Sequence, residues 1–294
     1  GAAEYSGKKD KLAVHFEERP AEDVIAEGNA DAAADMAGQT VEITVAFDTG
    51  QRVVIRRSLP GGQPEPEPEI LEPGDRDFGS GDAVAGDVSA IDGDVDADGT
   101  AAIDGDIRAG GDVDLAENAT IGGGVIGSDV SLDTGVSVGG GIVGSDVDIS
   151  GNATVGGPIV GDSDVDVDGD ATVSGPLEGE DISVGGTATV GGSIDAAGDV
   201  DVTNDATLDG DIAAGGGVDI DSSSLSTVDS IDADEDVSLD TPGLRIDGDV
   251  HSAGSTVAFD ADNISVTGGV TAGSIDCNGG NVTVAGQSCS AYTD

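Results

Sequence analysis

The segment DVDISGNATVGGPIVGD, residues 146–162, contains three short apolar stretches, each followed by Gly or Asp. The segment DVDLAENATIGGGVIGS, residues 112–128, repeats that order: an alternating acidic and apolar stretch, then Ala-Thr, then Gly-Gly before the last stretch. A stretch of three or four residues cannot bury one face alone, but stacked copies of the segment can bury a continuous core. We therefore expect each segment to form one turn of a solenoid with three short strands.

The pair of residues that opens each segment recurs with a period near 18. Successive turns begin near Asp94, Asp112, Asp129, Asp146, Asp164, Asp181, Asp199 and Val218. Eighteen residues over three faces predict a mainly β protein, a three-sided parallel β-helix (solenoid) over residues 77–294. About ten to twelve turns at a strand spacing of about 4.8 Å would form a rod of roughly 50–55 Å. The alternative is a disordered, acidic, Gly-rich segment, and a period held over seven intervals argues against it.

The composition suits the narrow interior of such a rod. Hydrophobic residues make up 37% of the 294 residues, but aromatic residues only 2%, and Trp is absent. We expect thin core layers of Val, Ile and Ala, with Asp pointing outward by period-two alternation. The 50 Gly residues suit corners at which the chain turns within one or two residues. No apolar run approaches the roughly 18 residues of a membrane span, so no transmembrane segment is expected.

The charge is strongly acidic, with 60 Asp and Glu against 10 Lys and Arg, a formal net charge of −50. Nucleic acid is not an expected partner, because phosphate binding needs clustered Lys and Arg. This charge would repel the compact state at ordinary ionic strength, whereas in molar salt the screening length falls to roughly 3 Å. The chain is therefore predicted to come from an extreme halophile. A rival reading is an acidic cation-binding protein, but its carboxylates would be clustered, and here they are spread.

Two zones precede the repeat. Residues 1–59 predict a small α+β module, with a helix over 21–36 and a hairpin in VEITVAFDTGQRVVIRRSL, residues 41–59. An Ala-rich loop is the alternative to the helix. Residues 60–76, PGGQPEPEPEILEPGDR, predict an extended Pro/Glu-rich linker. The more basic residues 3–16 resemble a segment that follows a removed leader or anchor.

The segments DVSLDTGVSVGGGIVGS at 129–145 and DISVGGTATVGGSID at 181–195, together with 146–162, resemble the bactofilins, the polymer-forming cytoskeletal family. The resemblance covers about residues 80–285. It implies a right-handed three-sided β-helix, a flexible Pro-containing flank and non-enzymatic end-to-end polymerisation. Left-handed hexapeptide helices share the period, so the period alone leaves the handedness open. The chain differs from that family in its predicted N-terminal module and in its features of an exported protein. Both differences argue against a cytoplasmic role.

Four sequons match the N-glycosylation acceptor pattern, at Asn118, Asn152, Asn263 and Asn281. The first two recur at the same phase of the repeat, so Asn-Ala-Thr also reads simply as a corner followed by a strand. The only cysteines are Cys277 and Cys289. A disulfide between them would staple the C-terminal end and imply an oxidising compartment, and two reduced thiols packed as small apolar residues are the alternative.

Two acidic triplets match the start of an EF-hand calcium loop: Asp94, Asp96 and Asp98, and Asp164, Asp166 and Asp168. The Glu that such a loop needs at its last position is missing, and strand alternation already explains the spacing. Stacked turns would still align Asp into ladders about 4.8 Å apart, which could hold Ca²⁺, Na⁺ or K⁺ loosely. No other cofactor is expected.

Catalysis finds little support in the sequence. The two histidines, His15 and His251, are far apart in the chain, and no Ser or Cys stands in a recognisable nucleophile context. We therefore expect a non-enzymatic structural protein, a filament subunit or spacer at the cell surface or outside the cell. Its expected partners are further copies of itself in a homopolymer, and cell-surface components or glycans. The alternatives are a glycan-binding module of adhesin or virus tail-spike type, and an intracellular bactofilin-like scaffold.

Overall fold

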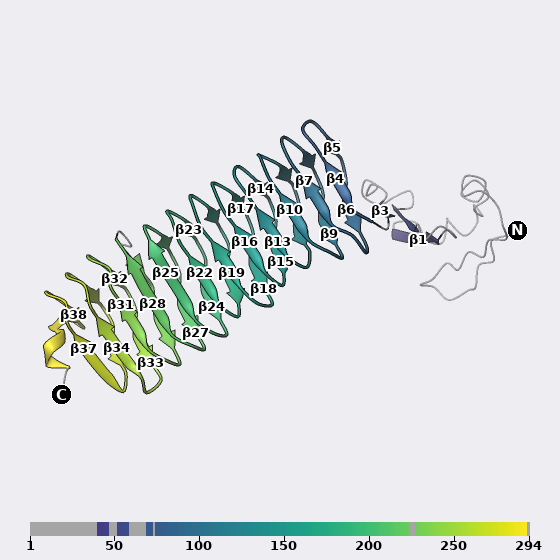
Figure 1. Cartoon of the computed structure of the whole chain (residues 1–294). Coiled ribbons are helices and arrows are strands. Elements are labelled where there is room, and N and C mark those ends of the chain that lie inside the picture. The colour runs from purple at the N-terminus through teal and green to yellow at the C-terminus, as the bar shows by residue number, and fades with distance from the viewer. Residues whose placement is uncertain (1–39, 47–51, 59–68, 73, 224–226, 293–294) are drawn as a thin grey trace, which may run out of the picture.

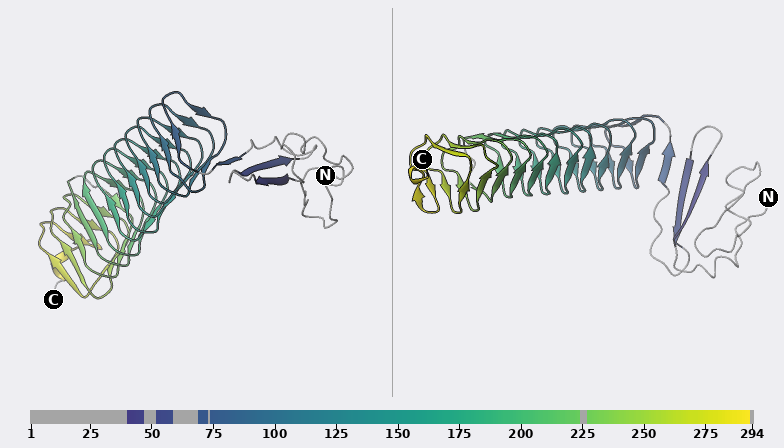
Figure 2. Two further views of the ribbon diagram at one scale, coloured as in Figure 1. Left: turned by 45° about the vertical axis from the view of Figure 1, so that its right-hand side comes forward. Right: turned by 90° about the horizontal axis from the view of Figure 1, so that it is seen from below.

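A computed structural model of the chain describes residues 40–46, 52–58, 69–72, 74–223 and 227–292. The repeat winds into a parallel β-solenoid of about 11 turns, drawn from blue to yellow in Figure 1. Each complete turn contributes one short strand to each of three faces, which Figure 2 shows as stacked rungs. The parallel β-solenoid predicted from the repeat is thus confirmed.

The first face is a single sheet whose strands pair in parallel from one turn to the next. Its strands are β4 (Arg76–Phe78), β7 (Val95–Ala97), β10 (Val113–Leu115), β13 (Val130–Leu132), β16 (Val147–Ile149), β19 (Val165–Val167), β22 (Ile182–Val184), β25 (Val200–Asn204), β28 (Val218–Ser222), β31 (Val237–Leu239), β34 (Thr256–Phe259) and β37 (Ser274–Cys277).

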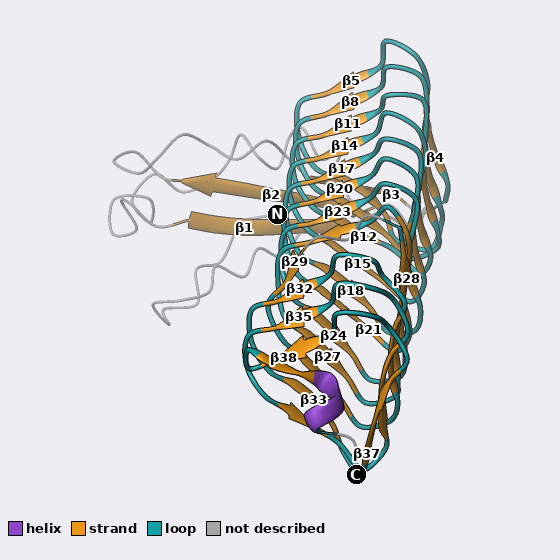
Figure 3. Ribbon diagram, turned by 90° about the vertical axis from the view of Figure 1, so that its left-hand side faces the viewer, coloured by secondary structure: helices purple, strands orange, loops and turns teal. Residues whose placement is uncertain are grey.

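The second face consists of two successive sheets. One contains β5 (Ala83–Val84), β8 (Ala102–Ile103), β11 (Thr120–Ile121), β14 (Ser137–Val138), β17 (Thr154–Val155), β20 (Thr172–Val173), β23 (Thr189–Val190) and β26 (Thr207–Leu208). The other contains β29 (Thr227–Val228), β32 (Arg245–Ile246), β35 (Ser265–Val266), β38 (Thr283–Val284) and the antiparallel β39 (Gln287–Ser288). Figure 3 looks along the stack and shows the two as one continuous row.

The third face extends beyond the repeat at its N-terminal end. Its solenoid strands are β6 (Val88–Ala90), β9 (Ile107–Ala109), β12 (Val125–Ile126), β15 (Ile142–Gly144), β18 (Ile159–Gly161), β21 (Leu177–Gly179), β24 (Ile194–Ala196), β27 (Ile212–Ala214), β30 (Ile231–Ala233), β33 (Val250–Ser252) and β36 (Val270–Thr271). Three earlier strands continue it, β1 (Thr40–Ala46), β2 (Arg52–Ser58) and β3 (Glu69–Glu72).

The strands of the predicted hairpin, β1 and β2, pair antiparallel. Strand β3, which lies within the segment assigned to the linker, pairs antiparallel with β2 and in parallel with β6. Through these pairings β3, with the sequence Glu-Ile-Leu-Glu, continues the third face. The helix predicted over residues 21–36 lies outside the described residues, as do residues 47–51 between β1 and β2 and residues 60–68 of the linker.

The core is a stack of small aliphatic side chains. On the first face Val130, Val147 and Val165 lie in register, and each is at most 1% exposed. The inward positions of all three faces are Val, Ile, Leu and Ala with few exceptions, and Phe259 is the largest fully buried side chain described. Burial of such side chains stabilises by roughly 1.5–3 kcal/mol each, which lets short strands without aromatic residues hold together.

Corners between the first and second faces need a backbone conformation that favours Gly. Gly151 and Gly169 have φ of +63° and +75° at this corner. A Cβ at Gly169 would also lie 2.5 Å from the carbonyl oxygen of Gly151 one turn below. Gly is therefore required here both by conformation and by the close stacking of successive turns.

Candidate functional site

Aspartates at the corner before the first face bind the backbone of the next turn. Asp181 Oδ1 accepts a hydrogen bond from Asp199 N at 2.8 Å, and Asp199 Oδ1 accepts one from Gly217 N at 2.7 Å. Asp94 Oδ1 accepts from Asp112 N at 2.9 Å in the same way. These carboxylates therefore satisfy amide groups that the short strands leave unpaired at the corner.

This role explains an asymmetry between the two acidic residues. From Gly74 to the C-terminus the chain has 41 Asp and four Glu, whereas residues 1–73 have five Asp and ten Glu. Aspartate carries its carboxylate close to the backbone and suits hydrogen bonds to nearby amides, whereas the longer Glu side chain does not. Much of the rod's charge is therefore tied to the geometry of its corners.

A second set of aspartates points outward from the first face. Burial, followed by the charges of neighbouring aspartates, raises the pKa of Asp96, Asp166 and Asp201 above the usual value. Among these charges, Asp114 has the largest effect on the pKa of Asp96, and Asp148 has the largest effect on the pKa of Asp166. The outward ladder of the first face thus contains groups of two or three like charges on adjacent turns, which repel one another, and serines separate these groups.

The structure does not bring the two calcium-loop triplets together. Asp96 and Asp166 are at the centres of β7 and β19, four turns apart, which is roughly 19 Å. Asp94 is already bonded to the next turn, and Asp168 Oδ1 accepts from Gly169 N at 2.7 Å. Within the described ranges, no group of three or more His, Cys, Asp or Glu side chains is placed to hold a metal ion.

All four sequon asparagines are exposed, and all lie at the corner between the first and second faces. Three of them, Asn118, Asn263 and Asn281, adopt φ of +77°, +63° and +56°. The fourth, Asn152, directly follows Gly151, which has positive φ itself. The asparagines thus occupy the same kind of turn as the corner glycines, and they align along one edge of the rod.

Cys277 and Cys289 lie at disulfide-bonding distance, with their Cα atoms 6.0 Å apart. Cys277 ends β37, and Cys289 begins the short 3₁₀ helix η1 (Cys289–Ala291). Strand β39 turns back antiparallel on β38 just before η1, and Tyr292 Oη donates to the carbonyl oxygen of Val284 at 3.3 Å. This C-terminal cap covers the last turn of the solenoid, as Figure 3 shows.

The third face carries an apolar column on its outer side that the sequence analysis missed. Ile126, Val143 and Val160 lie in register on three adjacent turns, with Ile126 and Val143 44% and 45% exposed. Arg108 precedes them and Glu178 follows them in the same column. The available signal was two successive apolar residues after Gly-Gly-x, where several other turns have an apolar residue followed by a charged one.

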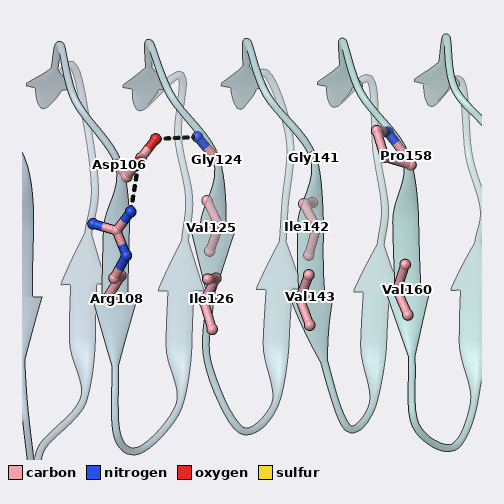
Figure 4. A pocket seen from close by; sticks show the side chains of 10 residues that line it. All are labelled: Asp106, Arg108, Gly124, Val125, Ile126, Gly141, Ile142, Val143, Pro158 and Val160. Atoms are coloured by element: carbon pink, nitrogen blue, oxygen red, sulfur yellow. Dashed lines mark hydrogen bonds and ion pairs between the residues drawn. The ribbon is translucent and has the colours of Figure 1, made fainter.

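A shallow hollow of about 190 Å³ runs beside this column, over Gly124 and Gly141 and up to Pro158 (Figure 4). The hollow exists because Gly124 and Gly141 have no side chains to fill the space beside the column. At one end Asp106 Oδ2 pairs with Arg108 Nη2 at 2.7 Å, while its Oδ1 accepts from Gly124 N at 2.9 Å. The hollow is thus open and mainly apolar, with one ion pair at its edge.

Of the two histidines, the structure describes only His251. His251 faces outward from β33, and His15 lies outside the described residues.

No helix among the described residues is long and apolar enough to cross a membrane. Neither protein-family models, nor curated proteins, nor solved structures give a match to this chain.

Proposed function

We propose that this chain is a non-enzymatic structural protein of an extreme halophile, a filament subunit or spacer at the cell surface built on a right-handed, three-sided rod. The observation that carries the proposal is the unbroken stack of buried aliphatic residues through about 11 turns. Twelve strands on the first face give a rod of roughly 50 Å at a spacing of about 4.8 Å. Solenoids of this kind supply long, uniform surfaces.

The two ends of the rod support attachment at the N-terminal side. There the third face continues into β3, β2 and β1, so the sheet extends beyond the first turn. At the other end η1 and β39 cover the last turn. A capped C-terminal end favours a rod that projects from its attachment, or that associates through its sides, over one that adds a subunit at that end.

The exposed sequons and the cysteine pair support a location outside the cytoplasm. Disulfides persist in oxidising compartments, and Asn-x-Ser/Thr sites are modified on exposed turns of exported proteins. The spread of −50 charges supports a high-salt environment, since screening weakens the repulsion between ladders. In that environment Na⁺, K⁺ or Ca²⁺ would balance the ladders as a loose cation atmosphere.

Immunogold electron microscopy of intact cells tests the proposal, with antibodies raised against the folded chain. We expect gold on the outer surface in continuous patches, without permeabilisation. Label that is found only in sectioned or broken cells would contradict a surface role and support an intracellular bactofilin-like scaffold. Peptide mass spectrometry of the same cells would show whether Asn118 and Asn152 carry glycan.

A further inference from the structure

The outward column of the third face is complementary to a reversed copy of itself, since its middle is apolar and its two ends carry opposite charges. In order along the rod it holds Arg108, Ile126, Val143, Val160 and Glu178, one residue per turn. Val143 is at the centre, an aliphatic residue flanks it on each side, and one charge of each sign closes the row. This order matches the requirement of a two-fold contact, in which a surface must be complementary to itself.

We propose that two copies of this chain pair side by side and antiparallel through the third face, with the two-fold axis at Val143. In that arrangement Ile126 of one copy faces Val160 of the other, twice. Arg108 likewise faces Glu178 at each end of the row. The inference rests on the proposed self-assembling role and names the surface that such an assembly uses.

The residues that line the hollow beside the column, Gly124, Gly141 and Pro158, fit the same two-fold axis. A two-fold rotation about an axis parallel to the strands places Pro158 of one copy over Gly124 of the other copy. The same rotation places Gly141 of one copy over Gly141 of the other. Pro158 is exposed at one end of the hollow, and Gly124 lies at the other (Figure 4). A projecting ring therefore meets a site that lacks a side chain, twice in each pair.

Charges on both sides of the footprint avoid like-charge contacts in this register. Asp106, paired with Arg108 in its own chain, faces Pro176, and Asp162 faces Ser128. Arg108 also lies 3.6 Å from Asp87, and its side chain is 42% exposed, so a carboxylate of a second copy can approach it. Moving the axis half a turn toward the C-terminus would press Glu178 onto Ile126, which costs desolvation without a partner.

The pairing is expected to be weak and favoured by salt. The column spans five turns, roughly 20 Å, which is less than a stable dimer interface needs. Molar salt screens the repulsion between two strongly acidic rods and strengthens apolar contact. Association should therefore rise with both protein and salt concentration, the reverse of an interface that depends mainly on charge.

Cysteine cross-linking of the full chain traps such a weak pair and reads its register. We compare an Ile126→Cys variant, a Val160→Cys variant and their mixture in molar salt with a thiol oxidant, and score covalent dimer on non-reducing gels. The mixture should give about tenfold more heterodimer than either variant gives homodimer, because residue 126 faces residue 160 only across copies. Asp232→Cys, on the same face outside the footprint, is the control and should remain monomeric.

Parallel pairing would instead cross-link each variant with itself. Equal yields of dimer in all samples would mean that the cross-links form by random collision. Either result overturns the proposal.

A charge exchange gives an independent check by sedimentation. Arg108→Glu and Glu178→Arg should each weaken association, and the double variant should restore it. If immunogold shows the protein on the surface but the mixture gives no excess dimer, the pairing is wrong while the proposed function stands.

Discussion

At the scale of single residues, the corner aspartates are structural groups as well as charges. Asp199 illustrates this, since its side chain accepts from Gly217 N while its own amide donates to Asp181. The preference for Asp over Glu in the rod follows from this short reach. A high-salt origin alone would not distinguish between the two acids.

Substitution of Asp199 separates the hydrogen bond from the charge. Asp199→Ala should lower the free energy of unfolding by about 0.5–1.5 kcal/mol, because the Gly217 amide loses its acceptor. Asp199→Asn keeps an oxygen acceptor and removes a charge, so its stability should equal or exceed that of the natural chain. Denaturant titration at fixed salt measures both, with Asp195→Ala, an exposed carboxylate at the centre of β24, as the control. Equal loss in the alanine and asparagine variants would contradict a bonding role.

The outward ladder of the first face should make the rod more stable in mild acid. Burial and the charges of Asp219, Asp199 and Asp181 raise the pKa of Asp201 in the folded chain above its unfolded value. The folded state then binds the proton more tightly, so this group's contribution is fully present below the unfolded pKa and is lost as pH rises through the folded pKa.

Asp201→Asn should therefore raise the melting temperature at neutral pH and flatten its dependence on pH between about 4 and 7. Asp232→Asn serves as the control, because Asp232 lies on the third face, where its neighbours on the adjacent turns are Ala213 and His251 and carry no carboxylate. Melting curves by circular dichroism over this range measure the effect. A melting temperature that rises with pH in the natural chain, and does so unchanged in the Asp201 variant, would argue against repulsion in the ladder.

Sequence alone predicts which residues point inward in most turns, because an apolar residue alternates with a charged one. It fails at Val125–Ile126, Ile142–Val143 and Ile159–Val160, where both residues are apolar and either could face the core. The choice is made by register: Val125 stacks between Ile107 and Ile142, and this leaves Ile126 outside. The outward column of the third face could not be predicted for that reason, whereas the sequons and the cysteines could be recognised as motifs.

At the scale of elements, the strands are too short to be stable singly and depend on the turns above and below. The ends of the stack are therefore its weakest points. The C-terminal cap places η1 and Cys289 against the last turn, and Cys289 is only 2% exposed. The cysteine pair should accordingly stabilise the end of the rod more than its middle.

Hydrogen exchange before and after reduction tests this. With the pair reduced, exchange should accelerate in β37, β38 and η1, while protection in β16 to β22 should not change. The closed loop is short, so the loss on the chain-entropy model is about 3 kcal/mol at most. Complete thiol labelling of the folded chain without reductant would show that no disulfide forms, and uniform acceleration along the rod would contradict a local cap.

At the scale of the whole molecule, we expect the −50 charge and the stacked aspartates to make folding depend on salt. Neighbouring charges about 4.8 Å apart lie within a screening length at low ionic strength and are largely screened in molar salt. The β-type circular dichroism should therefore collapse on dialysis below about 0.5 M salt and return when salt is restored. An unchanged spectrum in dilute buffer would contradict the halophilic account.

We propose that this chain is a structural rod that acts through its surfaces and through contact with its own copies. Electron microscopy of the purified full chain in molar salt, over a range of protein concentrations, tests this most directly. It should show stiff rods of roughly 50 Å that associate side by side as concentration rises. Rods that stay strictly single at every salt and protein concentration, or particles without a rod, would contradict it.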